Sequence, residues 1–269
     1  MDVSNRVVVV TGGASGIGRA LCHAFAERGA RGTVVADLDE AGAQVVAGEL
    51  SAKGFSALAV RTDVAIEADV IALVDAAEQA FGPVEVFCAN AGIIALGGVE
   101  VADETWDRIW AVNVMSHIYA ARAVLPGMLE RKEGYLVHTA SAAGLLTQLG
   151  SAPYSVTKHA AVALAEWLSI THGDAGLRVS CLCPQGVWTN MTGAAVRDHG
   201  EVTASTAGRD GMLEPEVVAE AVLDAMAEER FLVLPHPEVA TYERRRAGDR
   251  ERWLRGMRKV QAQISGYIP

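Results

Sequence analysis

The sequence predicts an α/β protein in which a parallel sheet of about seven strands has helices on both faces. Three observations favour this class. Short runs rich in β-branched residues alternate with longer helical patterns along most of the chain. The runs are almost wholly apolar, as expected for strands that helices cover on both sides. A glycine-rich turn joins the first run to the first helical pattern, which is typical of a doubly wound, Rossmann-like sheet.

Each strand is predicted from a short apolar and β-branched run that ends in a turn or a helical pattern. Helices fill the gaps, where apolar residues recur three or four positions apart. We predict strands at residues 6–11, 32–36, 56–61, 84–89, 134–139, 178–183 and 231–234. Helices are expected at 17–28, 41–52, 67–81, 104–131 and 152–172, and another begins near Pro215.

We interpret residues 1–235 as one domain. Within it, residues 186–213 are rich in glycine, threonine, alanine and serine and show little periodicity, so they are predicted to form a mobile insert. Prolines at 235 and 237 then break the pattern, and residues 236–269 follow as a separate tail.

The tail is opposite in charge to the rest of the chain. Between residues 243 and 259 it has eight basic and three acidic residues. Trp253, Met257, Val260 and Ile264 mark one face of an amphipathic helix. We expect this helix to pack on its own domain or on a neighbouring subunit. Contact with a membrane surface or with nucleic acid is the weaker alternative.

Length and composition exclude several classes of protein. At 269 residues and 51% hydrophobic composition, the chain can form one large core. No apolar run reaches the roughly 20 residues that a membrane-spanning helix needs, and the amino terminus lacks a signal pattern. We therefore expect a cytoplasmic protein without a membrane partner. The net charge of −10 argues against nucleic-acid binding, which needs a basic surface.

The four cysteines, Cys22, Cys88, Cys181 and Cys183, follow no Cys-x-x-Cys pattern. Cys181 and Cys183 would share one strand face, but two thiols are too few for a zinc site. We expect no bound metal. Free, buried thiols are the better interpretation, and they fit a reducing compartment.

The turn after the first strand suits a bound phosphate. Residues 12–18 have the spacing Gly-x-x-x-Gly-x-Gly, which differs from the common dinucleotide pattern Gly-x-Gly-x-x-Gly. Glycines let the backbone approach a pyrophosphate, and the next helix supplies unpaired N–H groups and the positive end of its dipole. A glycine turn that binds no phosphate is the alternative.

Asp37 follows the second strand, nineteen residues after Gly18. A carboxylate there can accept hydrogen bonds from the ribose hydroxyls of adenosine and would repel a 2′-phosphate. No Lys or Arg lies in the turn before Gly18 or directly after Asp37. NAD is therefore favoured over NADP as the cofactor, although Asp37 alone could be an ordinary surface-loop residue.

Tyr154 and Lys158 lie one turn apart near the start of the helix predicted at 152–172. A cation that close favours the phenolate, so we expect Lys158 to lower the pKa of Tyr154 towards working pH. The pair could then transfer a proton. Ser141 lies thirteen residues before Tyr154, and no histidine or carboxylate at triad-like spacing supports a nucleophilic role for it.

In their order along the chain, these motifs resemble those of the short-chain dehydrogenase/reductase family over residues 5–235. The matching features are the glycine turn, Asn90-Ala91-Gly92 after the fourth strand, Asn113, Ser141, and Tyr154 with Lys158. The resemblance implies an enzyme that transfers a hydride between NAD and an alcohol or ketone. It also implies a homodimer or homotetramer, formed partly by the long helices around Asn113 and Tyr154.

The resemblance further implies a role for each polar residue. Tyr154 would exchange the proton, while Lys158 would tune it and bind the nicotinamide ribose. Ser141 would hold the substrate oxygen, and Asn113 would hold a water beside Lys158. Otherwise Ser141 is a turn or helix cap, and Asn113 and Lys158 are helix-surface residues.

The resemblance implies contacts with the whole length of the cofactor, including the adenine at Asp63 and Val64. One departure is the inserted Gln185 in the segment that would hold the nicotinamide amide, and another is the single asparagine before Ala91-Gly92. The implied cofactor residues are Gly12, Ser15, Gly16, Ile17, Gly18, Asp37, Leu38, Asp63, Val64, Asn90, Ala91, Gly92, Tyr154, Lys158, Pro184, Gly186, Val187 and Thr189.

Large apolar residues should surround the nicotinamide. They favour a small hydrophobic alcohol or ketone as the substrate, although core packing is the alternative for each. No cluster of Arg or Lys near them indicates a phosphate or carboxylate on the substrate. The predicted substrate residues are Ser141, Leu145, Leu146, Leu149, Tyr154, Trp188, Met191 and Met212.

The main functional prediction is an NAD-dependent oxidoreductase that interconverts a hydrophobic secondary alcohol and its ketone. An NADPH-dependent ketoreductase is one alternative, and Asp37 argues against it. A non-catalytic dinucleotide-binding scaffold or regulator is another, and the complete set of Asn113, Ser141, Tyr154 and Lys158 argues against that.

Overall fold

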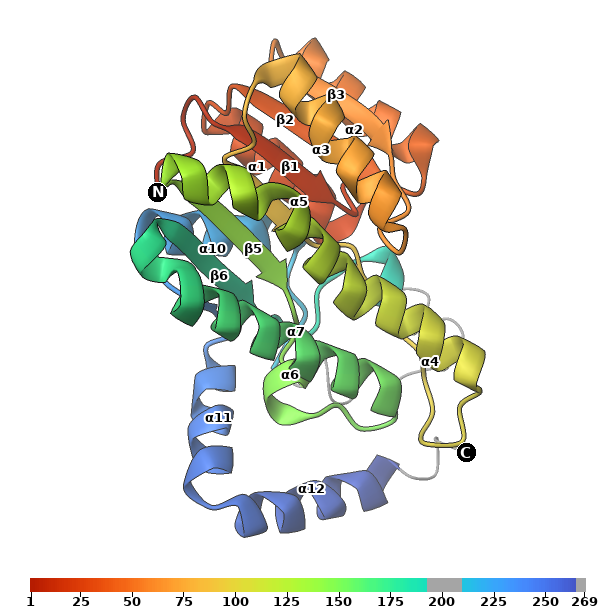
Figure 1. Ribbon diagram of the computed structural model, residues 1–269. Coiled ribbons are helices and arrows are strands. Elements are labelled where there is room, and N and C mark those ends of the chain that lie inside the picture. The colour runs from red at the N-terminus through yellow and green to blue at the C-terminus, as the bar shows by residue number, and fades with distance from the viewer. Residues whose placement is uncertain (193–209, 265–269) are drawn as a thin grey trace.

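The computed structural model describes residues 1–192 and 210–264. Its centre is a parallel sheet of seven strands in the order β3-β2-β1-β4-β5-β6-β7 (Figure 1). The predicted fold class is confirmed, and each strand lies within two residues of its predicted bounds. The strands are β1 Val7–Thr11, β2 Gly32–Asp37, β3 Ala57–Arg61, β4 Val86–Ala89, β5 Gly134–Thr139, β6 Leu177–Leu182 and β7 Leu232–Val233.

Helices cover both faces of the sheet. In Figure 1, α3, α5 and α7 lie in front of it, and α1, α2 and α10 lie behind. The strands are apolar throughout because each contributes to two cores: Val7 and Val9 join the front core, whereas Val8 and Val10 join the other. These helices are α1 Gly16–Glu27, α2 Glu40–Ala52, α3 Glu67–Phe81, α5 Ser116–Arg131, α7 Ala152–His172 and α10 Pro215–Ala227.

The parallel register brings the carboxyl ends of the strands to one edge of the sheet. Thr11 of β1 pairs with Ala36 of β2, and Thr139 of β5 pairs with Leu182 of β6. The strand order reverses between β1 and β4, which is the place where open α/β sheets bind ligands. The site is therefore expected at the ends of these central strands.

The helix predicted at 104–131 is divided in three. It consists of α4 Asp103–Trp110, the π-helical turn η1 Ala111–Met115, and α5. No glycine or proline marks the change at η1, so the sequence pattern does not show it. Such π-helical turns are frequent at functional sites, and this one contains Asn113.

The tail forms two helices, and the predicted amphipathic stripe at residues 253–264 lies on the second of them. α11 spans Glu238–Gly248 and α12 spans Arg250–Ile264. Asp249 lies between them in an extended conformation, and its Oδ1 accepts a hydrogen bond of 2.9 Å from the backbone N–H of Arg252. This contact caps the amino end of α12 and fixes the bend.

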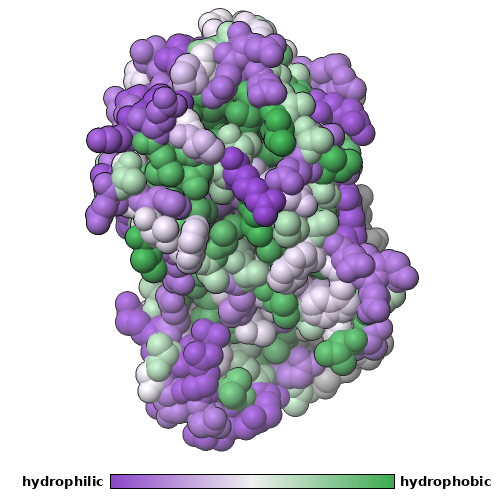
Figure 2. Space-filling view, in the orientation of Figure 1, coloured by the Kyte–Doolittle hydropathy of each residue, from purple (hydrophilic) through white to green (hydrophobic). Residues whose placement is uncertain are grey.

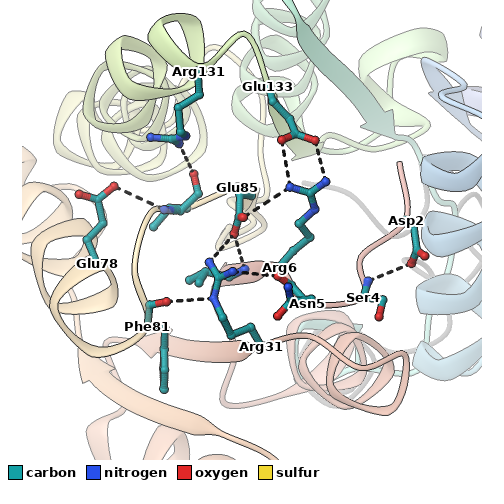
Figure 3. Close-up of polar contacts among 12 residues, drawn as sticks. Asp2, Ser4, Asn5, Arg6, Arg31, Glu78, Phe81, Glu85, Arg131 and Glu133 are labelled. Carbon is teal, nitrogen blue, oxygen red and sulfur yellow. Dashed lines mark hydrogen bonds and ion pairs between the residues drawn. The ribbon is translucent and has the colours of Figure 1, made fainter.

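A buried carboxylate, Glu85, connects the amino ends of the strands, at the end of the sheet away from the cavity (Figure 3). Glu85 accepts a hydrogen bond of 2.7 Å from the backbone of Val7 and pairs with Arg6 and Arg31 at 3.5 and 3.0 Å. Arg6 also pairs with Glu133, with oxygen distances of 2.7 and 3.0 Å. Because the contacts join β1 to the segments before β2, β4 and β5, we assign them a structural role.

Two sequence-based expectations concern the rest of the chain. The four cysteines are buried and free, as predicted. Among the described helices, none combines the length and apolar character needed to span a membrane. Most of the predicted insert, residues 193–209, lies outside the described residues.

Candidate active site

A cavity of about 1570 Å³ opens at the carboxyl ends of the central strands. It brings together segments that are far apart in the sequence, and every residue predicted to contact the cofactor lines it. These residues are Gly12, Ser15, Gly16, Ile17, Gly18, Asp37, Leu38, Asp63, Val64, Asn90, Ala91, Gly92, Tyr154, Lys158, Pro184, Gly186, Val187 and Thr189. Whether they contact a cofactor stays a prediction.

The glycine turn packs so closely at its glycines that no side chain fits at those positions. Gly12 has a φ of +67°, which favours glycine. A Cβ on Gly18 would lie 2.0 Å from the carbonyl oxygen of Gly12. Ser15 at the amino end of α1 makes no side-chain cap, and the first turn of α1 has no acidic residue. The first N–H groups of α1 are therefore available to an anion.

Asp37 is held in place at the end of β2. Its Oδ2 accepts a hydrogen bond from the backbone of Ala14 in the glycine turn, and its Oδ1 accepts one from Asp39, both at 3.0 Å. These contacts link the turn to the start of α2. They also fix a negative charge at the cavity wall, beside Leu38, whose side chain is half-exposed.

A network of hydroxyl and amide groups joins the ends of β1, β4 and β5. The Asn90 amide donates to the carbonyl oxygen of Thr11 and accepts from the hydroxyl of Thr139, both at 3.0 Å. The Thr11 hydroxyl accepts from the backbone of Asn90 at 3.0 Å. Sequence reasoning found Asn90 but missed both threonines, whose only signal was their place at the last position of a strand.

Ser141, Tyr154 and Lys158 meet at the same cavity, and all three are buried. Ser141 follows β5, and the other two lie in the first two turns of α7. The Lys158 ammonium donates a hydrogen bond of 2.9 Å to the backbone oxygen of Thr139, and it lies 5.6 Å from the centre of the Tyr154 ring. The structure thus gathers the predicted proton-transfer residues.

The prediction that Lys158 lowers the pKa of Tyr154 is wrong for this geometry. Burial raises the pKa of the Tyr154 phenol above its usual value, and a hydrogen bond with Ser141 only partly opposes this. Burial also lowers the pKa of Lys158 to about 8. Desolvation dominates both shifts, and the Lys158 ammonium is hydrogen-bonded to Thr139 and lies beside the ring of Tyr154.

Asn113 has a different setting from the other predicted catalytic residues. It is fully buried and is not part of the cavity lining. Its amide accepts from the backbone N–H of Ile93 and donates to the carbonyl oxygen of Ile93, both at 2.9 Å, and it contacts the Thr157 hydroxyl at 3.3 Å. It therefore joins the segment after β4 to α7. A direct contact with the substrate is excluded by this position.

Gly92 allows this packing. A Cβ there would lie 3.3 Å from the Lys158 ammonium and 3.4 Å from Oδ1 of Asn113. A larger side chain would push the lysine away from its position beside Tyr154. The packing around Lys158 and Asn113 therefore explains why the motif Asn90-Ala91-Gly92 ends in glycine.

The predicted substrate residues divide into two groups. Trp188, Met191 and Met212 line the cavity, and so does Leu146. Leu145 is buried in the front core, because consecutive residues of the short helix α6 Ala143–Leu146 point in different directions. Leu149 is not among the lining residues either.

The tail supplies cavity residues that sequence reasoning missed. Tyr242, Arg245, Arg252, Trp253, Met257 and Val260 line the cavity of their own chain. The expectation of no Arg or Lys near the substrate is therefore corrected, since two arginines reach the cavity from α11 and α12. Their sequence separation from the other motifs concealed them, although the apolar stripe and the basic charge were visible. In the described residues, no three His, Cys, Asp or Glu side chains are grouped as metal ligands.

Comparisons with known proteins identify the class. The profile of the short chain dehydrogenase family matches residues 6–200. The 1-deoxy-11-beta-hydroxypentalenate dehydrogenase of Streptomyces exfoliatus is 37% identical, with 88% of this chain and 86% of that protein covered. The 3beta-hydroxysteroid dehydrogenase 2 of Eggerthella lenta is 34% identical, with 81% and 86% covered.

Comparison with solved structures gives the same family. A short chain dehydrogenase/reductase from Burkholderia phymatum, in complex with NAD, has a TM-score of 0.84 at 36% identity, covering 93% of this chain and 96% of that one. LigO from Sphingobium, in its apo form, has a TM-score of 0.79 at 31% identity, covering 100% and 99%. The chain belongs to the short-chain dehydrogenase family. It is an oxidoreductase.

Proposed function

We propose that the protein is an NAD-dependent oxidoreductase that interconverts a hydrophobic secondary alcohol and its ketone. The observation that carries the proposal is the meeting of Ser141, Tyr154 and Lys158 in the cavity that the glycine turn also lines. The relatives support the reaction type, because the matched proteins from Streptomyces and Eggerthella are named as dehydrogenases of hydroxyl compounds.

The residues present fit a dinucleotide. The turn at residues 12–18 leaves no room for a Cβ at Gly18, and the uncapped start of α1 offers N–H groups to the pyrophosphate. Asp37 is positioned to accept hydrogen bonds from the adenosine ribose and to repel a 2′-phosphate. The NAD in the related Burkholderia structure supports the same choice. When bound, the nicotinamide takes up or returns the carbinol hydride.

The chain's own residues handle the proton. At neutral pH the raised pKa of Tyr154 keeps its hydroxyl protonated, so in ketone reduction it can donate that proton to the carbonyl oxygen. In alcohol oxidation Tyr154 must first lose its proton and then accept the one from the substrate hydroxyl. Burial lowers the pKa of Lys158 to about 8, so at neutral pH the lysine is still mostly charged, and its ammonium lies 5.6 Å from the centre of the Tyr154 ring.

Ser141 positions the substrate oxygen. Its hydroxyl accepts a hydrogen bond of 3.1 Å from the backbone of Ala143, has a long contact of 3.4 Å with the carbonyl oxygen of Pro184, and forms a hydrogen bond with Tyr154. The Ser141 hydrogen can turn from these partners towards a substrate oxygen beside Tyr154 and stabilise the charge that develops there. Asn113 acts through position, because it holds the segment after β4 against α7.

A panel of alcohols tests the proposal. The purified protein is mixed with NAD and with aliphatic and aryl secondary alcohols, matched primary alcohols and polyols, and NADH is followed by its absorbance. We expect hydrophobic secondary alcohols to be oxidised and the polyols to be inert. Tight NAD binding without turnover of any alcohol, or of any ketone with NADH, would contradict the proposal and favour a regulator.

Asp37 should determine the choice between the two dinucleotides. We expect Asp37→Ser to lower the ratio of kcat/KM for NAD to that for NADP by at least about 10-fold, because it removes the charge that repels a 2′-phosphate. Serine keeps an oxygen that can accept the hydrogen bond from Ala14. The control is Glu40→Gln, which removes a nearby charge that does not line the cavity. An unchanged ratio in Asp37→Ser would show that other residues select the cofactor.

We also propose that the protein acts in the cytoplasm as a homodimer or homotetramer. Large apolar side chains of α7 support self-association, since Val156, Trp167 and Ile170 are 47%, 56% and 84% exposed. Figure 2 shows hydrophobic residues at the surface of the face on which α5 and α7 lie. The four free, buried thiols fit a reducing compartment.

A further inference from the structure

Residues of α12 line the cavity, and Trp253 of this helix also packs against the front core. The helix crosses the molecule below α6 and the start of α7 in Figure 1, at the opposite end from β1. It packs chiefly against α11, and the rings of Tyr242 and Trp253 are 6.5 Å apart. Trp253, Met257 and Val260, at spacings of four and three residues, line the cavity. The apolar face of this helix therefore borders the space next to the proton-transfer residues.

The cavity is large for one small substrate. Its volume of about 1570 Å³ exceeds the roughly 300–1000 Å³ that is typical of ligand pockets. The dinucleotide accounts for the part near the glycine turn. Trp188, Met191 and Met212 line the same cavity, as do Trp253, Met257 and Val260 of α12. Trp188 is 52% exposed, so an aromatic surface is available there for a flat ring system to cover.

Arg245 and Arg252 place two positive charges at this end of the cavity. Residues 243–259 carry a net charge of +5, which leaves −15 for the rest of a chain whose net charge is −10. Neither arginine forms an ion pair with any residue in the described part of the chain, although the body of the protein is acidic.

Two carboxylates line the same region without pairing with these arginines. Asp249 caps α12 through the backbone of Arg252. Asp210 accepts a hydrogen bond of 3.0 Å from the Tyr242 hydroxyl, and its second oxygen is buried without a hydrogen-bond partner. Arg245 and Arg252 are exposed, so their guanidinium groups can pair with an anion that enters the cavity, and the planar fork of a guanidinium matches a carboxylate.

We propose that α11 and α12 form the substrate-recognition wall, and that the substrate is a secondary alcohol on an extended, multi-ring apolar frame that ends in a carboxylate. Arg245 and Arg252 bind the carboxylate, Trp188 and the apolar face of α12 cover the rings, and the carbinol lies at Tyr154. This inference rests on the proposed function for the site at Tyr154. An anion at these arginines could also be the cofactor pyrophosphate, so the test separates the two.

Binding of a matched pair of ketones tests the inference. The probes are para-linked acetylbiphenylcarboxylate and its methyl ester, titrated into the protein with NAD present, with quenching of tryptophan fluorescence as the signal. We expect the wild-type protein to bind the acid at least about 10-fold more tightly than the ester, because each charge-assisted pair at a partly exposed site contributes a factor of about three to ten.

The variant Arg245→Gln/Arg252→Gln should bring the acid-to-ester affinity ratio to about one. The control, Arg255→Gln/Arg258→Gln, removes the same charge from the same tail at positions that do not line the cavity, and it should keep the wild-type ratio. The NAD dissociation constant is measured for each protein and should change less than about twofold.

Three results would overturn the inference. The acid-to-ester affinity ratio could stay unchanged in Arg245→Gln/Arg252→Gln, or it could fall equally in the control variant. The third result is a weakening of NAD binding large enough to account for the fall in the ratio. The reduced probe, the corresponding hydroxyethyl acid, is then offered with NAD. Selective binding of the acid without its oxidation would contradict the proposed function and leave the recognition wall in place. Equal oxidation of the hydroxyethyl acid and its ester, unaffected by the arginine substitutions, would support the proposed function and contradict the recognition wall.

Discussion

Tyr154→Phe is expected to lower turnover by about 10³-fold while NAD affinity stays within about twofold of wild type, because only the proton donor and acceptor is lost. Phenylalanine fills the same buried space, so the packing around α7 is preserved. Removing a phenol whose pKa is raised by burial also removes a desolvated polar group, which limits any loss of stability. The measurements are kcat with a responsive alcohol and NAD titration by fluorescence.

The matched control is Tyr119→Phe on α5, which removes a phenol hydroxyl outside the cavity lining. Its turnover should equal that of wild type. Near-normal turnover in Tyr154→Phe would show that another group moves the proton. A parallel loss of NAD binding would mean that Tyr154 holds the cofactor more than it serves the chemistry.

Gly18→Ala is expected to abolish measurable NAD binding and to lower the free energy of unfolding by about 2–4 kcal/mol. The added Cβ would lie 2.0 Å from the carbonyl oxygen of Gly12 and 2.7 Å from the Asn90 amide. The first of these contacts is with backbone, so it can be relieved only by moving α1 away from the turn. Urea denaturation and NAD titration measure the two effects.

Gly48→Ala provides the comparison. Gly48 lies in α2, it is exposed, and no atom within 4 Å would meet its added Cβ. Alanine there should raise stability by about 0.5–1 kcal/mol, because glycine loses more backbone entropy in a helix. NAD binding should be unchanged. If Gly18→Ala behaved like Gly48→Ala, close packing at the turn would have no part in cofactor binding.

The order of strands and helices along the chain could be predicted because the local sequence patterns agree with the burial of each element. Strands covered on both faces must be apolar throughout, and β1 with its four valines shows this directly. The places of the glycine turn, Asp37, Ser141 and Tyr154 followed in turn, since each lies at or just beyond a strand or helix boundary. Parallel strands bring such positions to one edge of the sheet, so their meeting at one cavity was foreseeable.

Other features depended on distances that no sequence pattern contains. Leu146 lines the cavity and Leu145 does not, although both are adjacent residues of the front core. The fully buried Asn113 forms hydrogen bonds across two segments, which its place in a helical pattern did not reveal.

Sequence by itself determined the sheet, the glycine turn and the set of predicted proton-transfer residues, because these depend on periodicity and on short-range spacing. Only the tertiary structure decided the charge behaviour of Tyr154 and Lys158 and the position of the tail. Burial of Tyr154 and Lys158 raises one pKa and lowers the other, which the spacing of the two residues could not show. The bend at Asp249 brings Arg252 and Trp253 to a cavity formed by residues far earlier in the chain. Desolvation and long-range packing depend on everything that surrounds a residue, and that is known only when the chain is folded.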